Sequence, residues 1–283
     1  MIDRSALESL INSRLESGDV ELPVFDDIAL RIHREVRENK LDADLICKIL
    51  EEDIALVTEL LRMANSAFFS GMSPVGSLKE AAVRLGVRQI ASIVFSVSQK
   101  RLYSASKGLF QERLKNLWKH TSAVSIGARW VAANSGYRNL ADEAFVGGLL
   151  HDIGKLSLLC IIEDLMVNES LEIEDEVIDQ TLLAMNCEHG ATLLDSWNFP
   201  ESFKTIVLQQ FDEDLDTGNT VLCMIRLVDR VCMLDGLGDM QTDEVIDLAS
   251  LPEIAALSLS ETDVEELREV LVQVRGEERQ AAA

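Results

Sequence analysis

A histidine and an aspartate stand next to each other in an apolar stretch, residues 147–155, that begins with two glycines. The pair is His151-Asp152, and its apolar surroundings predict that it is buried. Burying ionisable groups is costly unless something compensates them. The sequence leaves two compensations open. Either both side chains hold a divalent metal ion, or Asp152 pairs with Lys155 while His151 forms hydrogen bonds inside the core.

The elements that carry this pair are predicted to be helical. Apolar residues recur three and four positions apart through most of the chain, and aromatic residues make up only 5% of it. We expect one helix over residues 141–160, where adjacent side chains point roughly 100° apart and can share an ion only at the helix edge. Serines alternating with apolar residues over 92–98 also permit a strand, although the lack of turn signals favours a helix. Further helices are expected over residues 1–17, 28–36, 42–50, 54–64, 78–85, 90–97, 109–133, 177–197, 200–211, 220–234 and 260–275.

The composition is that of a globular protein. A chain of 283 residues with 47% hydrophobic residues can bury a sizeable core, in one large domain or two small ones. No apolar run approaches the ~20 residues of a membrane span, and no signal sequence is visible, so we expect a cytoplasmic protein. The five cysteines are widely spread without a Cys-x-x-Cys pair, which predicts reduced and buried side chains.

The formal net charge of the chain is −23. Binding to the phosphates of nucleic acids requires clustered lysines and arginines, and anionic membranes attract the same residues. We therefore expect neither nucleic acid nor membrane as a partner. The simplest interpretation of the acidic surface is solubility.

Several short motifs follow one another along the chain. They are Leu22-Pro23, Leu-Leu-Arg-Met-Ala-Asn-Ser at 60–66, Ser77-Leu78, Leu85-Gly86, Leu-Trp-Lys-His at 117–120, Ala-Phe-Val-Gly-Gly-Leu-Leu-His-Asp-Ile-Gly-Lys at 144–155, Gly190-Ala191 and Trp197. Over roughly residues 20 to 235 the chain thereby resembles the HDOD family, the HD-related output domain of bacterial signalling. The resemblance implies an all-α fold, in which an HD-domain-like helical bundle is joined by an additional N-terminal helical subdomain. It also implies a regulatory role, usually without catalysis.

This resemblance suggests a division of the chain into three parts. Residues 1–108 would form the N-terminal helical part of the HDOD domain, and residues 109–235 the HD-like helical subdomain. Residues 236–283 would form a C-terminal helical tail.

The wider HD superfamily, which the central part also resembles, consists of metal-dependent phosphohydrolases with a His, a His-Asp pair and a later Asp as ligands. The matching positions are His120, His151, Asp152 and Asp229. Four such side chains on separate helices could enclose one divalent ion, Fe, Mn, Ni or Zn, with positions left for water. The alternative is that no metal is bound and that His120 is an ordinary hydrogen-bonded histidine.

Asp229 has an alternative partner of its own. Arg226 and Arg230 flank it, so a salt bridge could take the place of a metal.

The chain departs from the HD-GYP phosphodiesterases, which this region also resembles. Those enzymes place a histidine where this chain has Asn186, and a pair of histidines where it has Gln209-Gln210. The GYP signature has no counterpart. Because these imidazoles are missing, a two-metal phosphodiesterase centre is not expected.

These observations predict a cytoplasmic regulatory module that acts by binding a protein partner of a signalling pathway or a ligand and has no catalytic residues. The alternative is a single-metal phosphohydrolase acting on a nucleotide or phosphomonoester, in which Lys155 would neutralise phosphate charge. A third interpretation is a structural adaptor without metal, in which Lys155 pairs with Asp152 and Arg230 pairs with Asp229.

Overall fold

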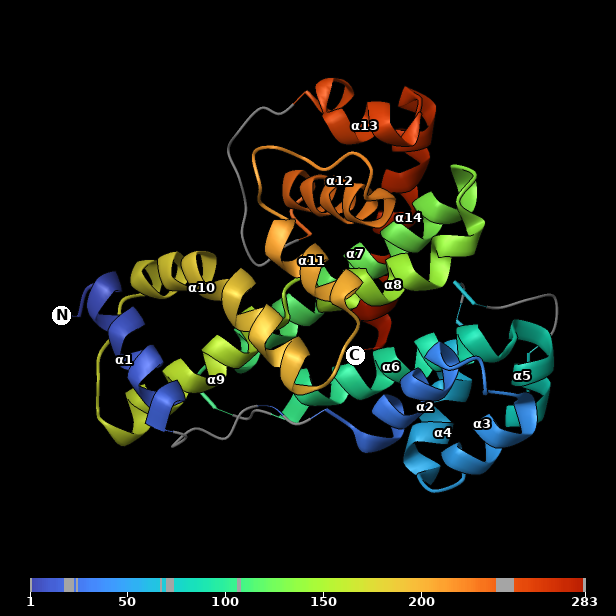
Figure 1. The fold of residues 1–283 in the computed structure, drawn as a ribbon, viewed down its shortest axis with the longest axis horizontal. Coiled ribbons are helices and arrows are strands. Elements are labelled where there is room, and N and C mark those ends of the chain that lie inside the picture. The colour runs from blue at the N-terminus through green and yellow to red at the C-terminus, as the bar shows by residue number, and fades with distance from the viewer. Residues whose placement is uncertain are drawn as a thin grey trace. The chain divides into compact units, whose positions relative to one another are not determined.

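The computed structural model describes residues 2–17, 23, 25–66, 68–69, 74–105, 108–237 and 247–281, the last six of these in backbone only. Every regular element in these ranges is a helix, which confirms the predicted all-α fold (Figure 1). The segment for which a strand was also considered lies within the helix α6 (Val87–Ala105). Leu22, in the first of the motifs, lies outside the described residues.

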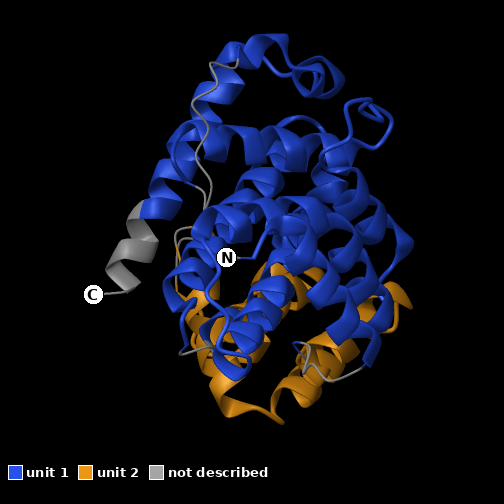
Figure 2. Ribbon diagram, turned by 90° about the vertical axis from the view of Figure 1, so that its left-hand side faces the viewer, with its two compact units in different colours: residues 1–23, 103–283 blue, residues 24–102 orange. Residues whose placement is uncertain are grey.

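The chain divides into two compact units (Figure 2). One unit comprises residues 24–102, and the other comprises residues 1–23 together with residues 103–283. The first helix therefore belongs to the same unit as the C-terminal part of the chain, whereas the division expected from the sequence placed it in an N-terminal part, residues 1–108.

The smaller unit contains helices whose ends are fixed by polar side chains. Ser77 Oγ accepts a hydrogen bond from the backbone N–H of Glu80 at 3.2 Å, and the Glu80 carboxylate accepts one from Gly76 N at 2.7 Å. Asn65 follows an apolar helix and binds both backbone groups of Val75, at 2.8 and 3.0 Å. The helices of this unit are α2 (Asp27–Arg37), α3 (Ala43–Leu50), α4 (Ile54–Ala64), α5 (Leu78–Leu85) and most of α6.

The larger unit is built around one long helix, α7 (Gln111–Asn134), against which α8, α12 and α14 pack. A second group of helices forms where α10 packs against α1, α9 and α11. The elements of this unit besides α7 are α1 (Arg4–Ser17), η1 (Arg138–Leu140), α8 (Ala141–Leu150), α9 (Ile153–Asn168), α10 (Asp175–Ser196), α11 (Glu201–Gln209), α12 (Thr220–Leu234), η2 (Leu248–Ser250), α13 (Pro252–Leu257) and α14 (Glu261–Ala281).

Glycines allow the central helices to approach each other closely. A Cβ atom added at Gly148 would lie 2.5 Å from the Cα atom of Ser125, so α8 contacts the backbone of α7. A Cβ atom at Gly154 would overlap the backbone oxygen of Asn186, which brings the start of α9 against α10. Only a residue without a side chain permits both approaches.

The continuous helix predicted over residues 141–160 is wrong at one point. The structure ends α8 at Leu150 and begins α9 at Ile153, with His151 and Asp152 in the turn between them. Periodicity could not reveal this break, because the residues on both sides are apolar and helical. The break matters because it places the two ionisable residues at the ends of helices rather than inside one.

Residues 138–168 together form a stretch long and apolar enough to cross a membrane by length and composition. The apolar window of this stretch is 94% buried inside the protein. Such burial is what the core helices of a globular protein show, and the stretch includes the ionisable pair at its centre.

Candidate metal centre

Both histidines of the predicted site are held by backbone carbonyls at the same ring nitrogen. The Nδ1 atom of His151 lies 2.7 Å from the carbonyl oxygen of Gly148, and Nδ1 of His120 lies 3.3 Å from that of Leu237. A carbonyl oxygen only accepts, so each Nδ1 carries a hydrogen and donates it. In the neutral rings, each Nε2 atom then presents a lone pair.

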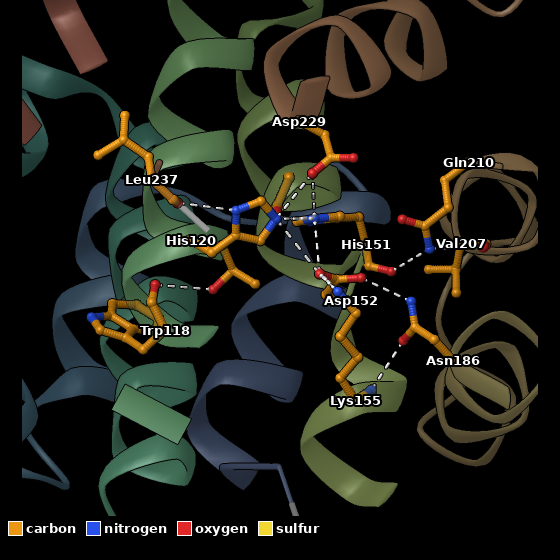
Figure 3. A network of polar contacts seen from close by, with 12 residues as sticks. Trp118, His120, His151, Asp152, Lys155, Asn186, Val207, Gln210, Asp229 and Leu237 are labelled. Carbon is orange, nitrogen blue, oxygen red and sulfur yellow. Dashed lines mark hydrogen bonds and ion pairs between the residues drawn. The ribbon is translucent and has the colours of Figure 1, made fainter. Parts of the chain in front are cut away.

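These two Nε2 atoms face each other and two carboxylates (Figure 3). They are 3.2 Å apart, and His120 Nε2 lies 3.0 Å from Asp229 Oδ1. Asp152 Oδ2 lies 3.6 Å from Nε2 of His120 and 3.4 Å from Nε2 of His151. The structure therefore brings together all four predicted site residues, from α7, the α8–α9 turn and α12; we call them the His/Asp cluster.

The His/Asp cluster is buried. The side chains of His120, His151 and Asp152 are at most 2% exposed, and that of Asp229 is 15% exposed. Burial lowers the pKa of His151, because the charged ring loses its hydration. Burial by itself would raise the pKa of Asp152, but the ammonium of Lys155 and the two imidazoles outweigh it and hold that pKa well below its usual range.

The same balance applies to Asp229. Burial acts to raise its pKa, but a protonated His120 would donate a hydrogen bond from Nε2 to Asp229, and this bond and the positive charge bring the pKa below the usual value. Both carboxylates of the cluster are therefore ionised near neutral pH. Two carboxylates and two nitrogen lone pairs at such distances repel one another unless a proton or a metal cation lies among them.

A second layer of polar side chains holds Asp152. The ammonium nitrogen of Lys155 lies 2.8 Å from Asp152 Oδ2, and Asn186 Nδ2 donates to Asp152 Oδ1 at 2.8 Å. The same Asn186 side chain accepts the backbone N–H of Lys155 at 3.0 Å. The Asp152–Lys155 pair considered from sequence is thus present in the same place as the cluster of candidate metal ligands. The sequence did not reveal that Asn186 holds both residues. Position 186 had been considered only as the place where HD-GYP enzymes have a metal-binding histidine.

Gln210 also belongs to this second layer. Its Nε2 atom donates to the backbone oxygen of His151 at 2.6 Å and lies 3.1 Å from that of Val207. Asn186 and Gln210, two of the three amide residues found where HD-GYP enzymes have histidines, therefore hold the carboxylate of Asp152 and the backbone of His151.

The arginines next to Asp229 bind another carboxylate. Arg226 Nε lies 3.0 Å from Glu253 Oε1, and Arg230 Nε lies 3.8 Å from the same oxygen. Glu253 is fully buried, and Arg226 also donates to the backbone oxygen of Asp212 at 2.7 Å. Within the described part of the chain, the ion pairs of Asp229 are with the cluster histidines and not with these arginines.

Ligand atoms of His120, His151 and Asp229 all lie within 4.8 Å of one another, so these three side chains of the His/Asp cluster could hold a metal ion; Asp152 is not part of this group. Ligand atoms bound at ~2.1 Å to one ion lie roughly 3–3.5 Å apart, and the closest contacts in the cluster have these lengths. Histidine ligands of metals commonly donate their second ring nitrogen to a backbone carbonyl, as His120 and His151 do. Imidazole and carboxylate donors suit Fe, Mn, Ni and Zn alike, so the donor set does not choose among them.

Comparison with known proteins defines the family of this helical protein. The family model for the HDOD domain matches residues 22–212, and the chain belongs to the HDOD domain family. An uncharacterized protein of Treponema pallidum (strain Nichols) is 26% identical over 188 residues, which are 64% of this chain and 36% of that protein. The chain thus spans about a third of the length of this curated relative.

Solved structures share the fold. An HDOD domain protein of unknown function from Geobacter sulfurreducens has a TM-score of 0.77 at 23% identity, covering 97% of both chains. A protein of Shewanella amazonensis SB2B, provisionally described as a metal-dependent phosphohydrolase, has a TM-score of 0.75 at 19% identity, covering 98% of this chain and 99% of that one. At these identities the likeness establishes the fold.

Proposed function

We propose that this protein is a regulatory module of a cytoplasmic signalling pathway, which acts by binding a protein partner and contains a single-metal His/Asp cluster. Membership of the HDOD family supports the regulatory role. The observation that carries the proposal is the composition of the layer around the cluster. Lys155, Asn186 and Gln210 occupy the positions next to Asp152 and His151 and use their donors to hold them.

The side chains in this layer provide no ligands for a second metal ion. A two-metal centre for phosphodiester cleavage needs further imidazoles or carboxylates about 3.5–4 Å from the first ion. In this protein an ammonium and two carboxamides surround the cluster instead, and an ammonium has no lone pair to offer a metal.

A second candidate function is a single-metal phosphohydrolase. The convergence of His120, His151, Asp152 and Asp229 favours it, as does the provisional description of the Shewanella amazonensis protein of the same fold. A metal ion bound there would polarise a phosphoryl oxygen and lower the pKa of a bound water. The Lys155 ammonium would add positive charge next to the phosphate.

Two measurements separate these functions. The first is turnover of p-nitrophenyl phosphate and bis(p-nitrophenyl) phosphate by protein loaded in turn with Fe, Mn, Ni and Zn. We expect none; turnover that disappears in His151→Ala would establish the hydrolase instead.

The second measurement compares the proteins retained from the source cells by the wild type and by a His120→Ala/Asp152→Ala variant. The regulatory module is expected to retain the same partners in both. A folded variant that loses them would show that the cluster is part of the partner-binding mechanism.

A further inference from the structure

One oxygen atom of the His/Asp cluster lies between the ammonium of Lys155 and the place where the two imidazoles could bind a metal ion. Asp152 Oδ2 lies 2.8 Å from the ammonium of Lys155, and the Nε2 atoms of His120 and His151 lie 3.6 and 3.4 Å away from it. A metal held by the two imidazoles would therefore lie near an oxygen that already binds a positive charge. Two cations on one buried carboxylate repel each other strongly, because little water screens them.

A hydrogen bond from the backbone of Lys155 to Asn186 helps to hold the lysine in this position. Its N–H donates to Asn186 Oδ1 at 3.0 Å, and the other end of the same carboxamide donates to Asp152 Oδ1 at 2.8 Å. The lysine is only 5% exposed. The ammonium, the carboxylate and the carboxamide thus form a closed ring in which Asp152 has a cationic partner without any metal.

The charges show what this lysine does to the site. With neutral imidazoles, the carboxylates of Asp152 and Asp229 and the ammonium of Lys155 leave one net negative charge in the buried site. Without the lysine there would be two negative charges, which the burial of both carboxylates makes costly. The chain therefore supplies part of the compensation that a metal would otherwise provide alone.

We propose that Lys155 is a tethered cation that compensates Asp152 in the metal-free protein and weakens metal binding, so that the metal binds reversibly. This inference rests on the single-metal site in the proposed regulatory module. A site without this lysine would hold its metal as a permanent structural part. With the lysine, the protein remains folded in both states, and occupancy follows the supply of free metal.

The test is the affinity for Mn²⁺ of the full-length wild type and of Lys155→Met, measured by equilibrium dialysis after treatment with chelator. Mn²⁺ is the probe because the five cysteines bind it poorly, as thiolates prefer softer metals. We expect Lys155→Met to bind Mn²⁺ about 10-fold more tightly or more, because a repelling charge is gone. In chelator Lys155→Met should melt at a lower temperature than the wild type, and Mn²⁺ should remove this difference in melting temperature.

The matched control is Lys204→Met. Lys204 also bridges carboxylates, Asp195 at 2.7 Å and Glu201 at 2.6 Å, but these are outside the His/Asp cluster. This variant should bind Mn²⁺ as the wild type does. If Lys155→Met does not fold in chelator, Lys155→Gln removes the charge while keeping a donor for Asp152, and the same increase in affinity is expected.

Affinity equal to or weaker than that of the wild type in the neutral variants would overturn the inference, because Lys155 would then be only a positioning residue for Asp152. Binding of Mn²⁺ by a neutral variant and not by the wild type supports it. Binding by neither protein overturns it, yet leaves the proposed partner-binding role intact, since that role requires no metal.

Discussion

The imidazole rings of His120 and His151 meet through their Nε2 atoms, 3.2 Å apart, although 31 residues separate them in the chain. Each ring is fixed from behind by a backbone carbonyl on Nδ1. Two rings in this arrangement present lone pairs to the same point, which is the arrangement in which a metal ion binds imidazoles.

Replacing one of these histidines should empty the site. We expect protein purified without chelator to contain up to one equivalent of Fe, Mn, Ni or Zn, and His151→Ala to contain none, because the site loses one of its two imidazole donors. Metal content by plasma mass spectrometry measures this. The control is His189→Gln, which should retain the metal. His189 is a buried histidine outside the cluster, and its Nε2 atom lies 2.8 Å from Ser157 Oγ. Equal metal in wild type and His151→Ala would place the metal elsewhere in the chain.

Asn186 should contribute to stability as the carboxamide that joins Lys155 and Asp152. Asn186→Leu removes two hydrogen bonds and leaves a buried N–H and a carboxylate oxygen without them. We expect the free energy of unfolding to fall by about 2–4 kcal/mol. Urea denaturation measures this, with Asn134→Leu as the control, because the side chain of Asn134 is exposed and binds only within its own helix. A loss below about 0.5 kcal/mol would contradict the second-layer role.

Gly148 should tolerate no side chain. In Gly148→Ala the new Cβ atom would lie 2.5 Å from Ser125 Cα, and backbone atoms cannot move aside as a flexible side chain can. We expect a destabilisation of about 1–3 kcal/mol from overpacking, measured by thermal or urea unfolding. Gly76→Ala is the control, because its Cβ atom would meet only Glu80 Oε2 at 3.6 Å. Equal stability of the two variants would show that α8 can move away from α7 at little cost.

The protein should lose stability between pH 6.5 and pH 4. Burial lowers the pKa of His189 to about 4, and that of His33 to about 4 with a smaller contribution from Arg37, while an unfolded histidine has its pKa near 6.5. Over this interval the unfolded chain binds protons that the folded protein does not, so stability is full above pH 6.5 and falls as the pH falls. Each group adds up to about 1.4 kcal/mol per pH unit to the slope.

Urea denaturation at a series of pH values measures this slope. His189→Gln should reduce it and leave the His33 contribution. An unchanged slope in that variant would mean that His189 is as easily protonated in the folded protein as in the unfolded one.

Much of the fold could be predicted from the sequence because helical periodicity is a local property. The helix expected over residues 220–234 is found as α12 (Thr220–Leu234), where Asn219 caps the first turn and the apolar pattern ends with the helix. The break between α8 and α9 could not be predicted in this way. His151 and Asp152 have local partners in Gly148 and Lys155, but the other residues that they contact come from distant parts of the chain, which periodicity does not register.

The resemblance to HD proteins supplied the four cluster residues, and the structure brings them together; their role as metal ligands stays a prediction. The second layer was harder to foresee. Asn186 lies in a long helix whose sequence gives no sign of its partners, since Asp152 and Lys155 are more than thirty residues away. The signal available in the sequence was a polar residue directly after the apolar run at 182–185, and the structure shows that this residue is fully buried.

The buried pair of Arg226 and Glu253 has a mechanical consequence for the cluster. Arg226 lies on α12 one turn before Asp229, while Glu253 lies on α13, beyond the segment that follows α12. Lifting α13 from the protein would strip a buried arginine of its carboxylate, at a cost of about 3–5 kcal/mol. α13 and the part of α12 that carries Asp229 are thus coupled through one buried ion pair, so a displacement of either helix would disturb the other.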